Sequence, residues 1–138
     1  MTMQYGVALR NAQLDQIEST ISTSPKLRFY SGSMPANCAA SATGTLLAEL
    51  TLPSDWLAAA SSGSKAKSGT WSGTGDAGAS TGTNAGYFRI YDSAGSVCHI
   101  QGTVTVTGGG GDMTLDNINI AENQAIAIST FTITGGNA

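Results

Sequence analysis

The clearest pattern of apolar and polar positions lies in residues 86–107, where two alternating stretches flank a turn. In the first stretch Phe88 and Ile90 share one side-chain parity, which predicts a strand with one buried face. The opposite parity, expected to face solvent, holds Tyr87, Arg89 and Tyr91. The turn, residues 92–95, contains Asp and Gly, and the apolar parity resumes in residues 100–106. We therefore predict an antiparallel β-hairpin.

A helical pattern covers residues 7–22. Its apolar positions recur at spacings of seven, three and four, which places them on one stripe: Val7, Leu14, Ile17 and Ile21. Ser24 precedes Pro25 and ends the pattern, because the residue before a proline is disfavoured in the α conformation. A single amphipathic helix must lay its stripe against another surface. We favour the protein's own sheet, and a neighbouring subunit is the alternative.

Short strands joined by turns account for most of the remaining chain. Alternation or apolar runs predict them at residues 26–31, 45–52, 113–120 and 125–134. In the last of these strands the apolar parity flips near residues 129–130, which indicates a β-bulge. Between the strands, Ser54 or Asp55 is expected to cap a single helical turn through Ala60, with Trp56 as a core plug at the end of a sheet.

These elements predict a mainly β fold with a single N-terminal amphipathic α-helix. An antiparallel β-sandwich or jelly roll of about six to eight strands is the natural way to close such a set. We assign residues 1–24 to the helix, which packs on the domain or reaches out from it. Residues 25–138 form the β-sandwich domain, with a Gly/Ser/Thr-rich loop at residues 61–86.

The biased segment at residues 61–86 consists mostly of Gly, Ser, Thr and Ala, which gain little from burial. Its first third is compatible with an edge strand, because Lys65, Lys67 and Trp71 lie at even spacing. Residues 72–85 are expected to form a long mobile loop, and long loops are frequently functional. We therefore expect a contact surface at this loop and at Trp71.

Composition and charge narrow the classes of function. Only 11% of the residues are charged, which suits a surface that is partly covered in an assembly. A formal net charge of −3 argues against a nucleic-acid partner, since phosphate binding needs clustered Lys and Arg. Lys65 and Lys67, the nearest approach to a cluster, are interpreted as a solvated strand face. Because the sequence has neither a signal-peptide pattern nor a run of 18 apolar residues, we expect cytoplasmic synthesis and no membrane insertion.

Reactive residues form no recognisable catalytic arrangement. The stretch from Gly73 to Gly78 matches G-x-G-x-x-G, but it lacks the strand-to-helix context that a dinucleotide site requires. The single histidine, His99, is expected to be a cross-strand partner on the hairpin. Cys38 and Cys98 either pair or remain small buried thiols, and we favour the thiols. We therefore predict a protein that is not an enzyme and that uses no cofactor or metal.

Five blocks of the chain resemble, in this order, a family of small proteins encoded in the virion-structure modules of tailed bacteriophages and prophages. The blocks are KLRFYSGSMPANCAA, GTLLAELTLPSDW, KAKSGTWSGT, FRIYDSAGSVCHIQGTV and GDMTLDNINIAENQAIAISTFTIT. The similarity extends over most of the chain. Because the family has no catalytic motif to transfer, the resemblance implies a structural component of the capsid or tail.

Small β-sandwich or jelly-roll proteins of such particles recur as cement (decoration) proteins at the joints between capsomers. The resemblance thus implies a virion protein on the capsid surface, homo-oligomeric and bound to the major capsid protein. The residues expected to contact the partner are Val7, Leu14, Ile17, Ile21, Lys65, Lys67, Trp71, Tyr87 and Tyr91. A tail, neck or baseplate component is one alternative. The other is a carbohydrate-binding module that uses Tyr87 and Tyr91 as an exposed aromatic pair.

Overall fold

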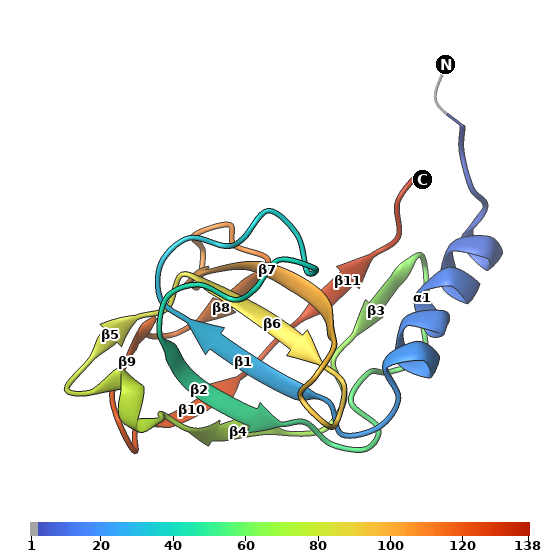
Figure 1. Cartoon of the computed structure of the whole chain (residues 1–138). Helices are drawn as coiled ribbons and strands as arrows, with labels where there is room; N and C mark the ends of the chain where they lie inside the picture. Colours follow the sequence, from blue (N-terminus) through green and yellow to red (C-terminus); the bar gives the residue numbers. More distant parts are fainter. Residues whose placement is uncertain (1–2) are drawn as a thin grey trace.

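The computed structural model describes residues 3–138, in which one α-helix, one 3₁₀-helix and eleven strands occur (Figure 1). In chain order they are α1 (Val7–Ile21), β1 (Lys26–Tyr30), β2 (Leu46–Thr51), β3 (Ser64–Ala66), β4 (Trp71–Thr74), η1 (Ala77–Ala79), β5 (Thr83–Asn84), β6 (Tyr87–Tyr91), β7 (Cys98–Val106), β8 (Met113–Leu115), β9 (Asn119–Ile120), β10 (Ala125–Ile128) and β11 (Thr132–Thr134). The predicted mainly β fold with one N-terminal helix is confirmed.

The helix α1 ends before Pro25, as its sequence predicts. Leu14 and Ile21 are buried and Ile17 packs against the core, so most of the apolar stripe faces the protein's own strands. Val7 is the exception, with 47% of its surface exposed. It lies in the first turn of the helix, beyond the part that packs on the strands. The prediction that Val7 shares the buried stripe is therefore wrong.

Five strands form the main sheet in the order β2-β1-β6-β7-β8. Neighbours are antiparallel except β7 and β8, which are parallel. The predicted hairpin is present as β6 and β7, and its turn is fixed by the Asp92 carboxylate, which accepts the Ser96 N–H at 2.8 Å. A bulge beside Tyr91 leaves His99 without a residue directly opposite. The expected cross-strand partner of His99 is therefore absent.

The remaining strands continue the sheet around the same core. Ala48 of β2 forms a bridge with Gly75, just after β4, and β4 pairs with β10. In Figure 1, β4 and β10 run below β2, so that the strands make a curled multi-strand sheet. The last predicted strand is divided, because β10 pairs with β4 whereas β11 pairs with β3. The parity flip near residues 129–130 thus marks a change of partner strand rather than a bulge.

The segment at residues 61–86 is built into the sheet, and the prediction of a long mobile loop is wrong. It contributes β3, β4, η1 and β5. Its small residues allow neighbouring backbones to approach closely: a Cβ atom at Gly75 would collide with the carbonyl oxygen of Ala121, and one at Gly78 would lie 2.6 Å from that of Leu46. The glycine content of this segment therefore reflects close packing.

The core is centred on a chain of aromatic contacts. The ring centres of Trp71 and Trp56 are 6.0 Å apart, and those of Trp71 and Phe131 are 5.6 Å apart. Phe131 and Phe88 pack edge to face, with their ring centres 5.7 Å apart. The indole N–H of Trp56 donates to the carbonyl oxygen of Ser22 at 3.0 Å, which joins the end of α1 to the core. The prediction that Trp56 is a core plug is confirmed.

The predicted helical turn after Ser54 is not formed. Ser54 and Asp55 form a bend instead, and the residues that follow lie against the end of β3 and the residues just after it. Leu57 bridges Lys67, and the Ala58 N–H donates to the Ala66 carbonyl oxygen at 2.8 Å. Pairing over these residues satisfies backbone groups that a single helical turn would leave open.

Candidate functional site

Four residues predicted to contact a partner are buried, so the expectation that they are exposed is wrong. Lys65, Trp71, Tyr87 and Tyr91 have exposed fractions of 2%, 1%, 0% and 7%. Trp71 belongs to the aromatic core described above. Lys65 and the two tyrosines belong to two polar clusters, one beneath α1 and one on the outer face of the hairpin. Lys67 is partly exposed, and its ammonium donates to the Gly69 carbonyl oxygen at 2.8 Å.

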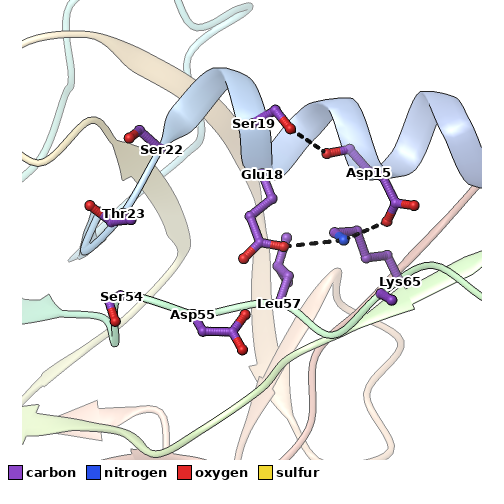
Figure 2. Close-up of a pocket in the computed structure, with 10 residues that line it drawn as sticks. Asp15, Glu18, Ser19, Ser22, Thr23, Ser54, Asp55, Leu57 and Lys65 are labelled. Atoms are coloured by element: carbon purple, nitrogen blue, oxygen red, sulfur yellow. Dashed lines mark hydrogen bonds and ion pairs between the residues drawn. The ribbon is translucent and has the colours of Figure 1, made fainter.

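Beneath α1, an open cavity of about 570 Å³ separates the helix from residues 54–59 (Figure 2). Asp15 and Glu18 point into it from successive turns of the helix, and the side chain of Lys65 reaches them from β3. The Lys65 ammonium lies 2.8 Å from Asp15 Oδ1 and 3.2 Å from Glu18 Oε2. It also donates to the carbonyl oxygen of Ala58 at 2.8 Å. All three ammonium protons therefore have acceptors.

The charges of this cluster stabilise one another. The hydrogen bond from Lys65 lowers the pKa of the Asp15 carboxyl, and the Ala60 N–H, which donates to the same carboxylate at 2.8 Å, lowers it further. Burial lowers the pKa of Lys65, but the hydrogen bonds to Asp15 and Glu18 outweigh it and raise the pKa overall. Both partners stay charged near neutral pH, so Asp15 is a weak proton acceptor. The cluster is suited to fastening α1 to β3 rather than to acid–base catalysis.

The outer face of the hairpin is covered by residues 32–44, which we call the cover loop. The loop has no regular secondary structure and passes over β6 and β7 (Figure 1). The hydroxyl of Tyr87 donates to the Thr43 carbonyl oxygen at 2.6 Å and accepts the Thr43 N–H at 2.9 Å. The Gln101 amide donates to the Pro35 carbonyl oxygen at 2.8 Å. Side chains predicted to face solvent thus hold the loop in place.

Arg89 lies at the centre of this covered face with 2% of its surface exposed. Its Nη2 donates to the carbonyl oxygens of Asn37, at 3.2 Å, and Ala40, at 2.8 Å. Its Nε donates to Gln101 Oε1 at 3.2 Å. No carboxylate of residues 3–138 forms an ion pair with it. Neutral oxygens, two of them from the cover loop, therefore solvate this charge.

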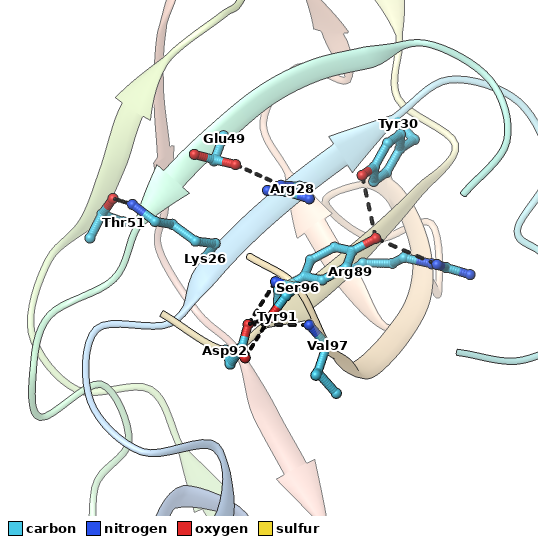
Figure 3. A network of polar contacts seen from close by, with 10 residues as sticks. All are labelled: Lys26, Arg28, Tyr30, Glu49, Thr51, Arg89, Tyr91, Asp92, Ser96 and Val97. Atoms are coloured by element: carbon cyan, nitrogen blue, oxygen red, sulfur yellow. Dashed lines mark hydrogen bonds and ion pairs between the residues drawn. The ribbon is translucent and has the colours of Figure 1, made fainter. Parts of the chain in front are cut away.

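A partly exposed network continues along the same face of the sheet (Figure 3). Arg28 Nε forms an ion pair with Glu49 Oε2 at 2.6 Å. The Cζ atom of the same guanidinium lies 4.4 Å from the centre of the Tyr91 ring. The hydroxyls of Tyr30 and Tyr91 are 3.5 Å apart. Burial, followed by the contact with Tyr91, raises the pKa of Tyr30 to about 12. Each of these four side chains therefore contacts a side chain of another strand.

Three of the six exposed large apolar side chains of residues 3–138 lie near the N-terminal end of the described chain, and the other three are Met34, Val97 and Val106. Met3, Val7 and Leu9 have exposed fractions of 71%, 47% and 50%. The segment that carries them is tied to the other end of the chain, because the Tyr5 N–H donates to the Asn137 carbonyl oxygen at 2.6 Å. Figure 1 shows the chain just before α1 and the chain after β11 extending beyond the sheet on the same side. We call residues 3–9 the N-terminal arm.

The geometry defines a mainly β protein whose buried polar clusters hold its own elements together. No protein-family model matches the chain, and neither a curated protein nor a solved structure matches it. Over residues 3–138, no group of three or more His, Cys, Asp or Glu side chains is placed to hold a metal ion together. None of the helices in that range is long and apolar enough to cross a membrane.

The sequence pattern singled out Lys65, Tyr87 and Tyr91, but it did not indicate the acidic residues of α1 or the cover loop that they contact. Asp15 and Glu18 are three residues apart on a helix, a spacing that places them on one face and was readable as a paired acidic site. Their buried partner lies 50 positions from Asp15, and no local pattern specifies that contact. The cover loop carries no periodicity at all, so nothing in its sequence indicates that it shields Arg89.

Proposed function

We propose that this protein is a structural component of a tailed-phage virion, and specifically a capsid cement protein that binds the major capsid protein as an oligomer. The resemblance of five sequence blocks to virion-structure proteins suggests the class. The observation that carries the proposal is the N-terminal arm, which presents Met3, Val7 and Leu9 to solvent at one end of the molecule. The buried polar clusters support it, since their groups are engaged in internal contacts.

Covering the arm is energetically favourable, because each Å² of apolar surface removed from water contributes roughly 25 cal/mol. Three exposed side chains give a weak contact for one copy. A shell repeats that contact many times, and binding only to the assembled lattice stabilises the lattice by mass action. A cement protein therefore needs modest affinity per copy and no reaction chemistry.

The proposed contact surface differs from the one that the sequence indicates. Leu14, Ile17 and Ile21 pack on the protein's own strands, and Trp71 lies in its core. Of the helix stripe, Val7 alone stays available, and Leu9, which is also exposed, lies on the opposite side of the same first helical turns. A small β-sandwich or jelly roll is the body expected of such a protein. The curled five-stranded sheet and the three short two-stranded sheets support that expectation.

The composition of purified particles tests the proposal directly. A cement protein is expected at one or more copies per capsomer when virions are quantified by mass spectrometry. A copy number in small multiples of three or six would favour the tail, neck or baseplate alternative. Absence from purified virions would overturn both structural roles.

A matched pair of variants tests the arm itself. Leu9→Glu places a charge in the proposed interface and is expected to abolish co-sedimentation with capsids that lack the protein. Gln13→Glu adds the same charge at an exposed position one turn further along α1, without removing an apolar side chain, and is expected to bind normally. Equal binding by both variants would exclude the arm as the capsid contact. Circular dichroism checks that both variants are folded.

The carbohydrate-binding alternative has lost its candidate site. It required Tyr87 and Tyr91 as an exposed aromatic pair, and both rings are buried. Tyr87 stacks on Tyr30 at 5.1 Å between ring centres, beneath the cover loop. A sugar would reach these rings only after the loop had left the sheet.

A further inference from the structure

The cover loop and β7 bring the two cysteines of the chain together. Cys38 lies in the loop and Cys98 is the first residue of β7, 60 positions later. Both are free, half-buried thiols, and their Sγ atoms are 2.8 Å apart. That separation is roughly 0.8 Å longer than a disulfide bond of about 2.05 Å. Forming a bond between them would require only a small local movement.

The surrounding contacts hold both sulfur atoms in this arrangement. Arg89 donates to the carbonyl oxygens of Asn37 and Ala40, which flank Cys38 on either side. Cys98 is held by the hairpin, where it lies opposite Tyr91 in the antiparallel register. The position of each cysteine is therefore set by neighbours that do not depend on the thiols themselves.

We propose that Cys38 and Cys98 form an intramolecular disulfide that locks the cover loop onto β7. The inference is independent of the proposed function, since it depends only on this geometry. A small-molecule disulfide such as oxidised glutathione is the oxidant. One cysteine thiolate attacks it, forming a mixed disulfide and releasing one glutathione thiolate. The other cysteine, as its thiolate, then displaces the second glutathione. The protein loses two protons and two electrons, and one glutathione disulfide is reduced to two thiols.

The environment of Cys98 makes this reaction slow near neutral pH. Burial, followed by the contact with Cys38, raises the pKa of the Cys98 thiol to about 12. Because the thiolate is the reacting form, oxidation is expected to accelerate as the pH rises. Once formed, the bond closes a loop of about 60 residues and restricts the unfolded chain, which predicts a rise in Tm on the order of 10 °C.

Peptide mapping of the full-length wild-type protein tests the bond. The protein is incubated with oxidised glutathione at mildly alkaline pH, alkylated, unfolded and digested with trypsin without a reductant. Cleavage after Arg28, Lys65 and Arg89 leaves the two cysteines on separate peptides, 29–65 and 90–138. We expect these peptides to be cross-linked until a reductant is added. We also expect no disulfide-linked dimer of the protein on a non-reducing gel.

Three outcomes would overturn the inference: two alkylated peptides, separate glutathione adducts on each cysteine, or a cross-link between two copies of the chain. Cys98→Ser is the matched control, because it retains Cys38 and removes only its partner. This variant is expected to show no rise in Tm on oxidation and no internal cross-link. A rise in Tm equal to that of the wild type would assign the effect to something other than this bond.

Discussion

Lys65 and Arg89 are two buried cations whose hydrogen-bond acceptors differ in charge. Lys65 lies beneath a helix and contacts two carboxylates, those of Asp15 and Glu18. Arg89 lies beneath an irregular loop and donates to neutral oxygens of Gln101, Asn37 and Ala40. Both side chains are 2% exposed, so burial alone does not distinguish them.

The two cations differ in what happens to the groups around them when the cation is removed. Asp15 and Glu18 are 49% and 25% exposed, so water can solvate their charges if Lys65 is removed. The helix that carries them also retains its own backbone hydrogen bonds. The cover loop lacks a repeating backbone ladder, and side chains of the hairpin hold it in place. Arg89 is therefore expected to matter more for the fold than Lys65.

The largest effect is expected from Arg89→Met, which keeps the length of the side chain and removes every donor. Carbonyl oxygens of the cover loop would lose their partner, and the free energy of unfolding should fall by about 3 kcal/mol. Urea denaturation measures this loss, and amide exchange should accelerate in residues 32–44. Arg28→Met is the control on the same sheet, where a partly exposed ion pair is expected to contribute less than about 1 kcal/mol. Equal losses for both variants would show that Arg89 matters no more for the fold than an exposed ion pair.

Removing the cation of the Lys65 cluster and removing its two carboxylates should lower the free energy of unfolding by different amounts. Lys65→Met fills the same space with an apolar chain and leaves two carboxylates that water can reach, so we expect a loss of roughly 1 kcal/mol. The combined variant Asp15→Asn with Glu18→Gln leaves a buried ammonium without a charged partner, and should be the less stable of the two. Urea denaturation of both variants compares them. If Lys65→Met is the less stable variant, the carboxylates and not the ammonium pay the larger free-energy cost of losing water.

Tyr87→Phe tests the loop contact without disturbing the sheet. It removes the hydroxyl that joins both polar groups of Thr43 and keeps the ring that stacks on Tyr30. We expect a loss of about 1 kcal/mol, with faster amide exchange at Thr43 and unchanged exchange in β6. Tyr30→Phe is the matched control, because its hydroxyl contact with Tyr91 is 3.5 Å long. If Tyr30→Phe has the larger effect, the loop does not depend on Tyr87.

The contrast between the two cations also shows what a sequence pattern can predict. The alternation in residues 87–91 predicted β6, its turn and its pairing, because strand periodicity and turn chemistry are local. The same alternation predicted an exposed second face, and that was wrong. Period two specifies that two faces exist, and only a distant segment decides whether the second is covered. Here that segment is the cover loop, which shows no periodic pattern.

The segment at residues 61–86 shows a second limit. Its abundance of Gly, Ser and Thr suggested flexibility, because composition cannot distinguish a mobile chain from one whose backbone is closely packed. Gly75 and Gly78 are small because carbonyl oxygens approach them. Likewise, the spacing of Lys65 and Lys67 suggested a shared solvated face, but β3 ends at Ala66 and only Lys65 meets acids from α1. Both errors arise from contacts between residues far apart in the sequence.

The smallest expected effect is a local one at acidic pH. Since the pKa of Asp15 is lowered below its ordinary value of 3.8 in the folded protein, the stability it contributes is present above that value and is lost as the pH falls through the folded pKa. The raised pKa of Lys65 acts at the other limit: its contribution is lost only as the pH rises above 10.5. The cluster therefore holds α1 throughout the interval between these limits. Amide exchange measured against pH should show α1 losing protection at acidic pH before β6 does.

Asp92 provides the control for this titration, because its carboxyl also has a lowered pKa but lies in the β6–β7 turn. Hydrogen bonds from the backbone of Ser96 and Val97 cause that shift. Asp92→Asn should leave the acid response of α1 unchanged, whereas Asp15→Asn should abolish it and reduce the protection of α1 at neutral pH. If α1 and the hairpin lose protection together in the wild type, the acid response is global unfolding. The ion pair beneath the helix would then have no separate role in holding α1, and the contrast with Arg89 would have to rest on the substitutions alone.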